Sequence, residues 1–107
     1  MSKYIVETDI QNDMRVQLSE YGICLRLQAG TFYTKTGTPV KIGIEGLPDL
    51  LFVGDDGFVA WLEVKKPGGN RRDGQKKFIK IMHSMGHKAE FVESIEDAKK
   101  AIGVDTK

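Results

Sequence analysis

The sequence of 107 residues lacks several features that would assign it to a particular class of protein. Its single cysteine, Cys24, excludes an internal disulfide bond and any zinc site built from several cysteines of one chain. No apolar stretch approaches the roughly 20 residues that a membrane-spanning helix needs. Residues 1–20 contain no apolar segment typical of a signal peptide, so we expect a cytoplasmic protein.

Aromatic residues are also sparse, and the net charge is close to zero. Aromatic side chains make up 8% of the chain and are scattered along it, so they predict no base-stacking platform. The formal net charge is +1, but the charges are unevenly distributed. Between Lys65 and Lys88, eight basic residues stand against one acidic residue, Asp73. This segment favours contact with a polyanion such as DNA, although a solvated helix face would have the same composition.

The length allows one domain, residues 1–107, and the residue pattern predicts an α/β fold for it. Apolar spacing predicts helices over residues 7–21, 71–85 and about 94–102, and strands over 23–29, 49–53, 58–65 and 89–92. Residues 30–46 are rich in Gly and Thr, which predicts a long loop or an irregular hairpin, with Val40–Ile44 as a candidate strand. The expected architecture is a central mixed sheet flanked by helices.

Two carboxylates lie on segments that otherwise read as buried strands. Asp49 begins one of these strands, and Glu63 lies inside the next. If residues 55–57 form a three-residue loop with Gly57 in the left-handed conformation, Asp49 lies opposite Glu63. A two-residue loop would instead place Asp49 opposite Leu62, and Glu63 would then form an ordinary cross-strand pair with a lysine.

Two neighbouring carboxylates need either a shared proton or a cation between them. Oxygen ligands without a nearby histidine or cysteine favour Mg²⁺ or Mn²⁺ over zinc. We therefore expect Asp49 and Glu63 to hold Mg²⁺, with the backbone carbonyl of Val64 as a further ligand. Lys65 lies two residues after Glu63, on the same side of the strand, where it could hold a water or stabilise developing negative charge.

Two further polar residues are expected to face this pair. Glu7 lies at the edge of the apolar face of the first helix, which makes it a further candidate ligand, although a first-turn glutamate also suits the helix dipole. Gln75 precedes Phe78 and Ile79 by three and four residues and so shares the inward face of the second helix. Trp61 alternates with Glu63, and we expect it to pack beneath the first helix.

These residues carry a resemblance to a known family. Pro48-Asp49 followed by Glu63-Val64-Lys65 is similar to the PD-(D/E)xK nuclease motif. Besides this motif, the resemblance includes Glu7 in an early helix, Gly46 before Pro48-Asp49, and Gln75 at a helix start. The order of these residues along about residues 5–98 resembles the virus-type replication–repair nuclease (VRR-NUC) family, stand-alone phage or bacterial type.

The resemblance implies a restriction-endonuclease-like α-β-β-β-α-β core and an Mg²⁺-dependent phosphodiesterase for which Mn²⁺ can substitute. It implies that Asp49 and Glu63 bind metal, that Lys65 is catalytic, and that Glu7 and Gln75 complete the site, with Asp9 an alternative to Glu7. It also implies a homodimer that resolves Holliday junctions, in the cytoplasm of a bacterium or a phage-infected host.

With the resemblance included, we expect basic side chains that follow the predicted strand 58–65 to bind DNA phosphates: Lys66, Arg71, Arg72, Lys76 and Lys80. Such contacts position DNA without reading its sequence, so we expect structure-selective binding. The loop 30–46, with Lys35 and Lys41, is expected to contact the branch point or a partner subunit. The alternatives are a nuclease for flaps, nicks or plain duplex, a DNA-binding module without cleavage, and a structural domain with solvated charges. No nucleotide cofactor and no membrane are expected as partners.

Overall fold

The computed structural model describes residues 7–104. Its elements in chain order are α1 (Glu7–Leu18), β1 (Ile23–Arg26), β2 (Gly30–Tyr33), β3 (Pro39–Ile42), β4 (Leu50–Val53), the 3-10 turn η1 (Asp55–Gly57), β5 (Val59–Val64), α2 (Asp73–Ser84), β6 (Lys88–Val92) and α3 (Ile95–Ala101). None of the helices within this range is long and apolar enough to cross a membrane.

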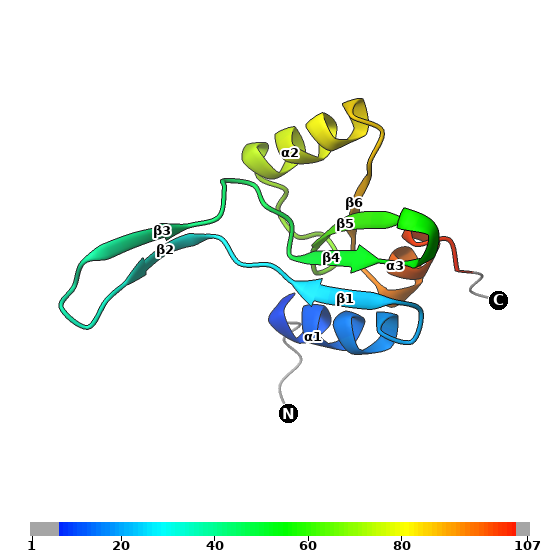
Figure 1. Ribbon diagram of the computed structural model, residues 1–107, viewed down its shortest axis with the longest axis horizontal. Helices are drawn as coiled ribbons and strands as arrows, with labels where there is room; N and C mark the ends of the chain where they lie inside the picture. The colour runs from blue at the N-terminus through cyan, green and yellow to red at the C-terminus, as the bar shows by residue number, and fades with distance from the viewer. Residues whose placement is uncertain (1–6, 105–107) are drawn as a thin grey trace.

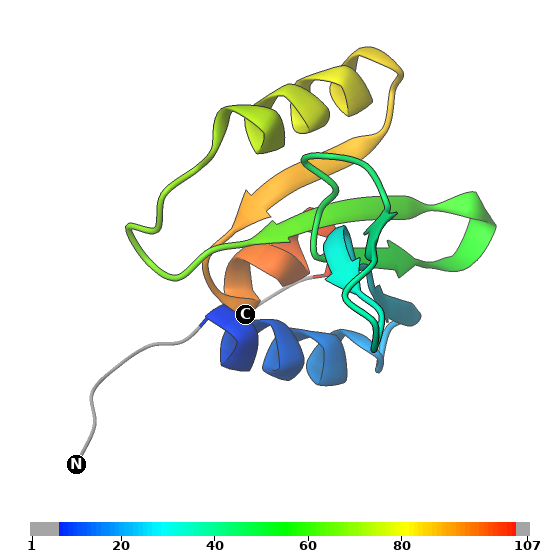
Figure 2. The same cartoon turned by 90° about the vertical axis from the view of Figure 1, so that its left-hand side faces the viewer.

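The main sheet is mixed, as the sequence predicts. Its four strands run in the order β1-β4-β5-β6; β1 and β4 pair antiparallel, as do β4 and β5, while β5 and β6 pair parallel. Helices α1 and α3 pack together on one face of this sheet, and α2 covers the other face over β5 and β6 (Figures 1 and 2). The result is a three-layered α/β fold in which the helices and the strands of the main sheet have the predicted order, with the β2–β3 hairpin between β1 and β4.

The hydrophobic core lies between the sheet and the α1–α3 layer. Met14 and Leu18 of α1 are buried there, which confirms the apolar face predicted for this helix. The remaining core residues come from the sheet and α3: Leu50, Phe52, Ala60, Leu62, Val64, Val92, Ala98 and Ala101. Ser94 begins α3, and its side chain accepts a hydrogen bond from the Asp97 N–H, as expected of an N-cap.

Apolar alternation over residues 23–29 suggests that Ile23 and Leu25 face the core, and the structure differs from this expectation, whereas the interpretation of Cys24 as a small core residue is confirmed. Ile23 and Leu25 of β1 are 61% and 46% exposed, whereas Cys24 packs against the core. Cys24 lies opposite the buried Phe52, and paired residues point to the same side of a sheet, so the pairing with β4 turns Cys24 inward. The expectation for Trp61 is wrong: it packs against Phe78 of α2 rather than beneath the first helix, with ring centroids 5.9 Å apart.

Of the two alternatives for residues 30–46, a long loop or an irregular hairpin, the structure has a hairpin, whose second strand is Pro39–Ile42 rather than Val40–Ile44; it projects away from the rest of the domain (Figure 1). Strands β2 and β3 pair only with each other in a separate two-stranded sheet, and every residue of both is exposed. Phe32 lies opposite Val40, and Gly30 lies opposite Ile42, so these residues share one face of the hairpin. Thr31 and Tyr33 lie on the other face.

Candidate active site

The turn between β4 and β5 has the three-residue form that brings the two acids together. The Gly54 N–H donates to the Phe58 carbonyl over 2.8 Å, and Gly57 has a φ of +78°. Leu50 consequently pairs with Leu62, and continuing the same register by one residue brings Asp49 opposite Glu63. The predicted register is confirmed, and the two-residue alternative is excluded.

Backbone groups on both sides fix Asp49 at the start of β4. Its Oδ2 accepts a 2.9 Å hydrogen bond from the Val64 N–H of β5, and its own carbonyl accepts from the Leu27 N–H, 2.8 Å away. Pro48, directly before it, is fully buried. The Asp49 carboxylate is therefore held against β5 at the point where Glu63 points to the same side.

Glu63 is a buried acid whose hydrogen bonding is incomplete. Its side chain is 3% exposed; Oε2 accepts a 3.1 Å hydrogen bond from Nε2 of Gln75, and Oε1 is buried without a partner. Burial first, and then the neighbouring Asp49 carboxylate, raise the pKa of Glu63 from 4.5 to about 9, although the positive charge of Lys65 acts in the opposite direction. Without a cation the pair therefore keeps a proton at neutral pH. A partnerless carboxylate oxygen beside a second carboxylate is a donor set that suits a hard cation such as Mg²⁺.

Lys65 and Glu7 lie at the far end of β5 from the turn. The Lys65 side chain is 5% exposed, and its charge stabilises the ionised form of Glu63. Oε2 of Glu7 accepts a hydrogen bond from the Lys66 N–H at 3.3 Å, and the charge of Glu7 also raises the pKa of Glu63. The first helix thus brings its acid toward the site, as expected. Across residues 7–104, however, no three His, Cys, Asp or Glu side chains gather closely enough to hold a metal.

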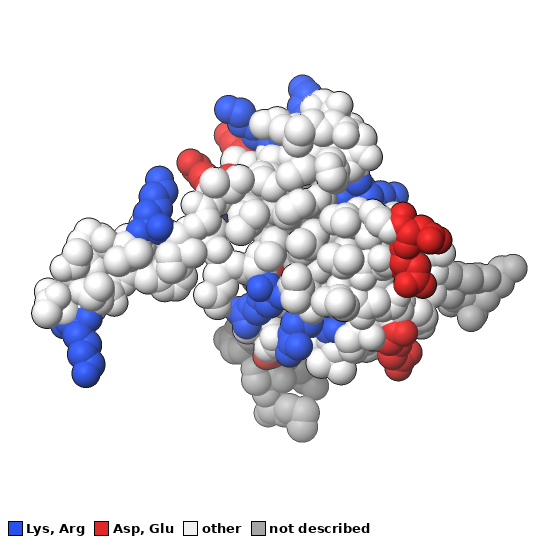
Figure 3. Space-filling model, in the orientation of Figure 1, with Lys and Arg blue, Asp and Glu red and all other residues white. Residues whose placement is uncertain are grey.

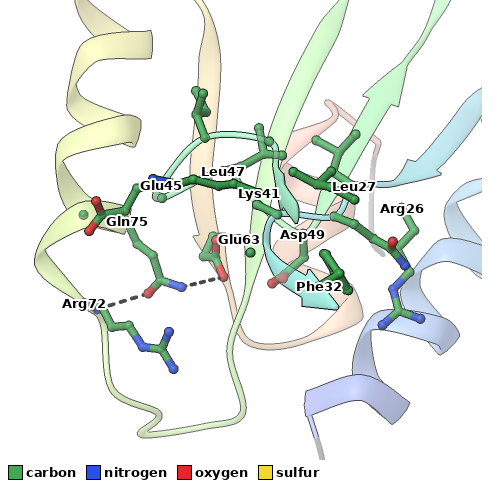
Figure 4. A pocket seen from close by; sticks show the side chains of 18 of the residues that line it. Arg26, Leu27, Phe32, Lys41, Glu45, Leu47, Asp49, Glu63, Arg72 and Gln75 are labelled. Atoms are coloured by element: carbon green, nitrogen blue, oxygen red, sulfur yellow. Dashed lines mark hydrogen bonds between the residues drawn. The ribbon is translucent and has the colours of Figure 1, made fainter. Parts of the chain in front are cut away.

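Gln75 connects the start of α2 to the acidic pair. Its Oε1 accepts a 3.0 Å hydrogen bond from the Arg72 N–H, while its Nε2 donates to Glu63. Figure 4 shows this chain of two hydrogen bonds running from the helix start to Glu63. The prediction that Gln75 faces inward is confirmed, and its amide fixes the orientation of the Glu63 carboxyl group.

Asp49, Glu63 and Gln75 line a cleft of about 700 Å³ between the base of the hairpin and the start of α2 (Figure 4). The wall beside the hairpin includes Phe32 and Ile42. Other lining residues carry polar or charged side chains: Gln11, Arg26, Gln28, Lys41, Glu45 and Arg72. Glu7 and Lys65 do not line the cleft, so of the five residues expected to form the site, three share the cleft and two lie beside it.

The predicted phosphate-binding residues do not form one continuous group. Arg72 lines the cleft. Arg71 contacts Glu93 at 3.6 Å, and its guanidinium lies 4.5 Å from the ring centre of Phe91. Lys66, Lys76 and Lys80 are exposed to solvent, and none of them lines the cleft. In Figure 3, basic side chains appear on the projecting hairpin and near its base, while acidic side chains lie at the opposite end of the molecule and also between the hairpin and α2.

Arg26 is a cleft residue that the sequence does not predict, and Gln11, which shares a helix face with Glu7, also lines the cleft. No motif marks Arg26. It reaches the cleft because β1 pairs with β4, which brings Arg26 opposite Leu50, one residue from Asp49. Lys41 was expected only as part of a loop that contacts DNA or a partner, and it lines the cleft because the hairpin base forms one wall.

Comparison with known proteins identifies no relative of this chain. Searches against models of protein families and against curated proteins find no match for this chain. The interpretation of the site therefore depends on its own geometry and chemistry.

Proposed function

We propose that the protein is an Mg²⁺-dependent phosphodiesterase of the PD-(D/E)xK type, similar to VRR-NUC nucleases, that cuts branched DNA. The observation that carries this proposal is the buried Oε1 of Glu63, which has no partner although it lies beside a second carboxylate at the cleft. Asp49 and Glu63 would hold the cation, with the Val64 carbonyl as the proposed backbone ligand. When bound, Mg²⁺ or Mn²⁺ would polarise the phosphate and lower the pKa of water.

The roles of the chain's own residues follow from their positions. During hydrolysis the water oxygen bonds to phosphorus, one P–O ester bond breaks, and the departing oxygen takes a proton. Lys65 is close enough to Glu63 to influence its charge, and it supplies a positive charge that stabilises the phosphate oxygens as negative charge develops. Gln75 holds Glu63 in one orientation.

DNA is the proposed substrate because basic side chains share the cleft with the acids. Arg26, Lys41 and Arg72 line the same cleft as Asp49 and Glu63. Lys66, Lys76 and Lys80 are further exposed basic side chains, although they lie outside the cleft. Contacts of this kind bind phosphates and do not read bases, which supports selection by DNA structure. Such a substrate is found in the cytoplasm of a bacterium or a phage-infected host.

We also propose that the active form is a homodimer. Strand β1 is an edge strand of the main sheet, and it exposes Ile23 and Leu25. A second copy related by a two-fold axis would cover the same residues on both chains. Light scattering on the wild type and on the double variant Ile23→Glu/Leu25→Glu tests this: we expect a dimer for the wild type and a folded monomer for the variant. Unchanged mass in the variant would contradict the proposed interface.

The experiment for the proposed activity compares the wild type with Lys65→Ala and Asp49→Asn on a labelled four-way junction and a matched linear duplex, in Mg²⁺, Mn²⁺ or EDTA. We expect symmetric cuts at the junction that disappear in EDTA and in both variants. Circular dichroism identifies a variant that fails to fold, and either folded variant is sufficient for the test.

The other outcomes separate the alternatives. Equal cutting of linear duplex would support the nuclease chemistry and reject the junction preference, and flapped or nicked duplexes then identify the substrate. Salt-sensitive binding without any cut would indicate a DNA-binding module. No binding and no response to cations would indicate a structural domain.

A further inference from the structure

Phe32 is an exposed aromatic side chain in the cleft that contains the acidic pair. It is 43% exposed, and it lines the cleft together with Asp49 and Glu63 (Figure 4). Its partner across the hairpin is Val40, which is itself 42% exposed. Within residues 7–104, the aromatic pairs are Phe52 with Phe58 and Trp61 with Phe78, so the ring of Phe32 stacks on no other ring.

The chemistry around Phe32 combines an apolar ring with positive charge. Arg26, Lys41 and Arg72 line the same cleft. A ligand that satisfies both parts needs a flat apolar surface and a nearby anion. A nucleobase with its phosphate has both, because every base has a π-face that can stack on an aromatic side chain.

We propose that Phe32 is a base-stacking residue that makes this cleft selective for DNA with an unstacked base, as at a branch point or in a gap. The inference rests on the proposed function, because it assigns the substrate of the same site. In continuous duplex both faces of every base are covered by neighbouring bases, so a side chain can stack only where the helix is interrupted. Phe32 therefore distinguishes interrupted DNA from plain duplex without reading sequence.

The hairpin allows this hypothesis to be tested without disturbing the core. Strands β2 and β3 pair only with each other, so a substitution in β2 leaves the main sheet and its core residues unchanged. Tyr33 is a matched control: it is the next residue, it is 71% exposed, and it is not among the residues of the cleft. Phe32→Trp retains an aromatic face and tests for rescue.

The experiment measures binding by fluorescence anisotropy in EDTA, where a cation-dependent nuclease does not cut, at one fixed salt concentration. Two probes are compared: a duplex with one unpaired nucleotide, and the same duplex with an abasic site at that position. We expect the wild type, Tyr33→Ala and Phe32→Trp to bind the base-containing probe about 5- to 100-fold more tightly than the abasic probe. We expect Phe32→Ala to bind both probes equally.

The remaining outcomes would overturn the inference. If Phe32→Ala keeps the preference of the wild type for the base, or if the wild type has none, Phe32 does not stack on a base. If Phe32→Ala changes the molar mass by light scattering and leaves the preference intact, the residue instead contacts a second copy. Failure of the proposed function looks different: a preference for the base that depends on Phe32, in a protein that makes no cut in Mg²⁺ or Mn²⁺, would support base stacking and reject the nuclease.

Discussion

Asp49 and Glu63 lie opposite each other at one end of β4 and β5: Oδ2 of Asp49 accepts a hydrogen bond of 2.9 Å from the Val64 N–H, and the Asp49 carboxylate lies close enough to raise the pKa of Glu63. The three-residue turn between β4 and β5 brings these residues together, although they are fourteen positions apart in the sequence. Two buried, neighbouring acids favour a retained proton or a bound cation, and four predictions depend on this pair or on the segments around it.

The first prediction concerns cations. Mg²⁺ or Mn²⁺ should raise the melting temperature of the wild type at pH 8, because a cation replaces the proton that Asp49 and Glu63 share. A cation concentration of about one hundred times the dissociation constant should raise the free energy of unfolding by about 2.7 kcal/mol. Glu63→Gln should abolish the increase, whereas Glu20→Gln, at an exposed acid, should retain it. Differential scanning fluorimetry measures both, and an increase that survives in Glu63→Gln would contradict the site.

The second prediction concerns pH. The pKa of Glu63 is raised from 4.5 to about 9 in the folded protein, so the folded state binds more protons than the unfolded state between these values. This contribution to the free energy of unfolding is fully present below about pH 4.5 and is lost as the pH rises toward 9. Urea denaturation in EDTA should therefore show stability declining over this range. Glu63→Gln should remove the part of the decline in stability that the Glu63 carboxyl group causes. An identical decline in the wild type and the variant would contradict the raised pKa of Glu63.

The third prediction concerns Gln75, which joins Glu63 to the backbone of Arg72. Gln75→Ala removes both hydrogen bonds and should lower the free energy of unfolding by about 1–3 kcal/mol. The proposed cleavage should lose kcat more than KM, because Glu63 loses its fixed orientation. Lys76→Ala, at the adjacent exposed position, should leave stability unchanged and raise KM. Urea denaturation and single-turnover cleavage measure these effects, and equal losses in the two variants would exclude a positioning role.

The fourth prediction concerns Gly46, where the chain passes close to the start of α2. Its φ is +83°, and a Cβ at this position would collide with the carbonyl oxygen of Gly74. Gly46→Ala should therefore destabilise the fold and displace Gln75 from Glu63. Gly37→Ala is the control, because Gly37 has a φ of +85° and open space around it, so it bears only the backbone cost of about 1–2 kcal/mol. Thermal denaturation should place Gly46→Ala well below Gly37→Ala; equal melting temperatures would mean that the contact with Gly74 does not matter.

The acidic pair could be predicted because the determining signals are local. Gly57 favours the left-handed conformation that closes a three-residue turn, and the turn alone sets which residues of β4 and β5 face each other. Gln75 could be predicted from helical spacing, because its inward face is shared with neighbouring apolar residues. In both cases a short segment contains all the information that the position of the side chain requires.

The residues that could not be predicted depend on pairings between distant segments. Alternation along β1 indicates a strand and suggests that Ile23 and Leu25 face the core, but pairing with β4 leaves both of them exposed. Trp61 follows the same face as Glu63, but the sequence does not say which helix covers that face. Arg26 reaches the cleft only through the β1–β4 pairing.

The projecting hairpin contributes no residue to the hydrophobic core. The length and side chains of β2 and β3 can therefore change at little cost to the stability of the domain, whereas a change near Asp49 or Glu63 affects a buried pair. One chain thus contains a hairpin that tolerates substitution and an acidic pair whose surroundings do not. Under the proposed function, substrate preference could be redesigned by exchanging the hairpin as a module while the chemistry of the acidic pair is retained.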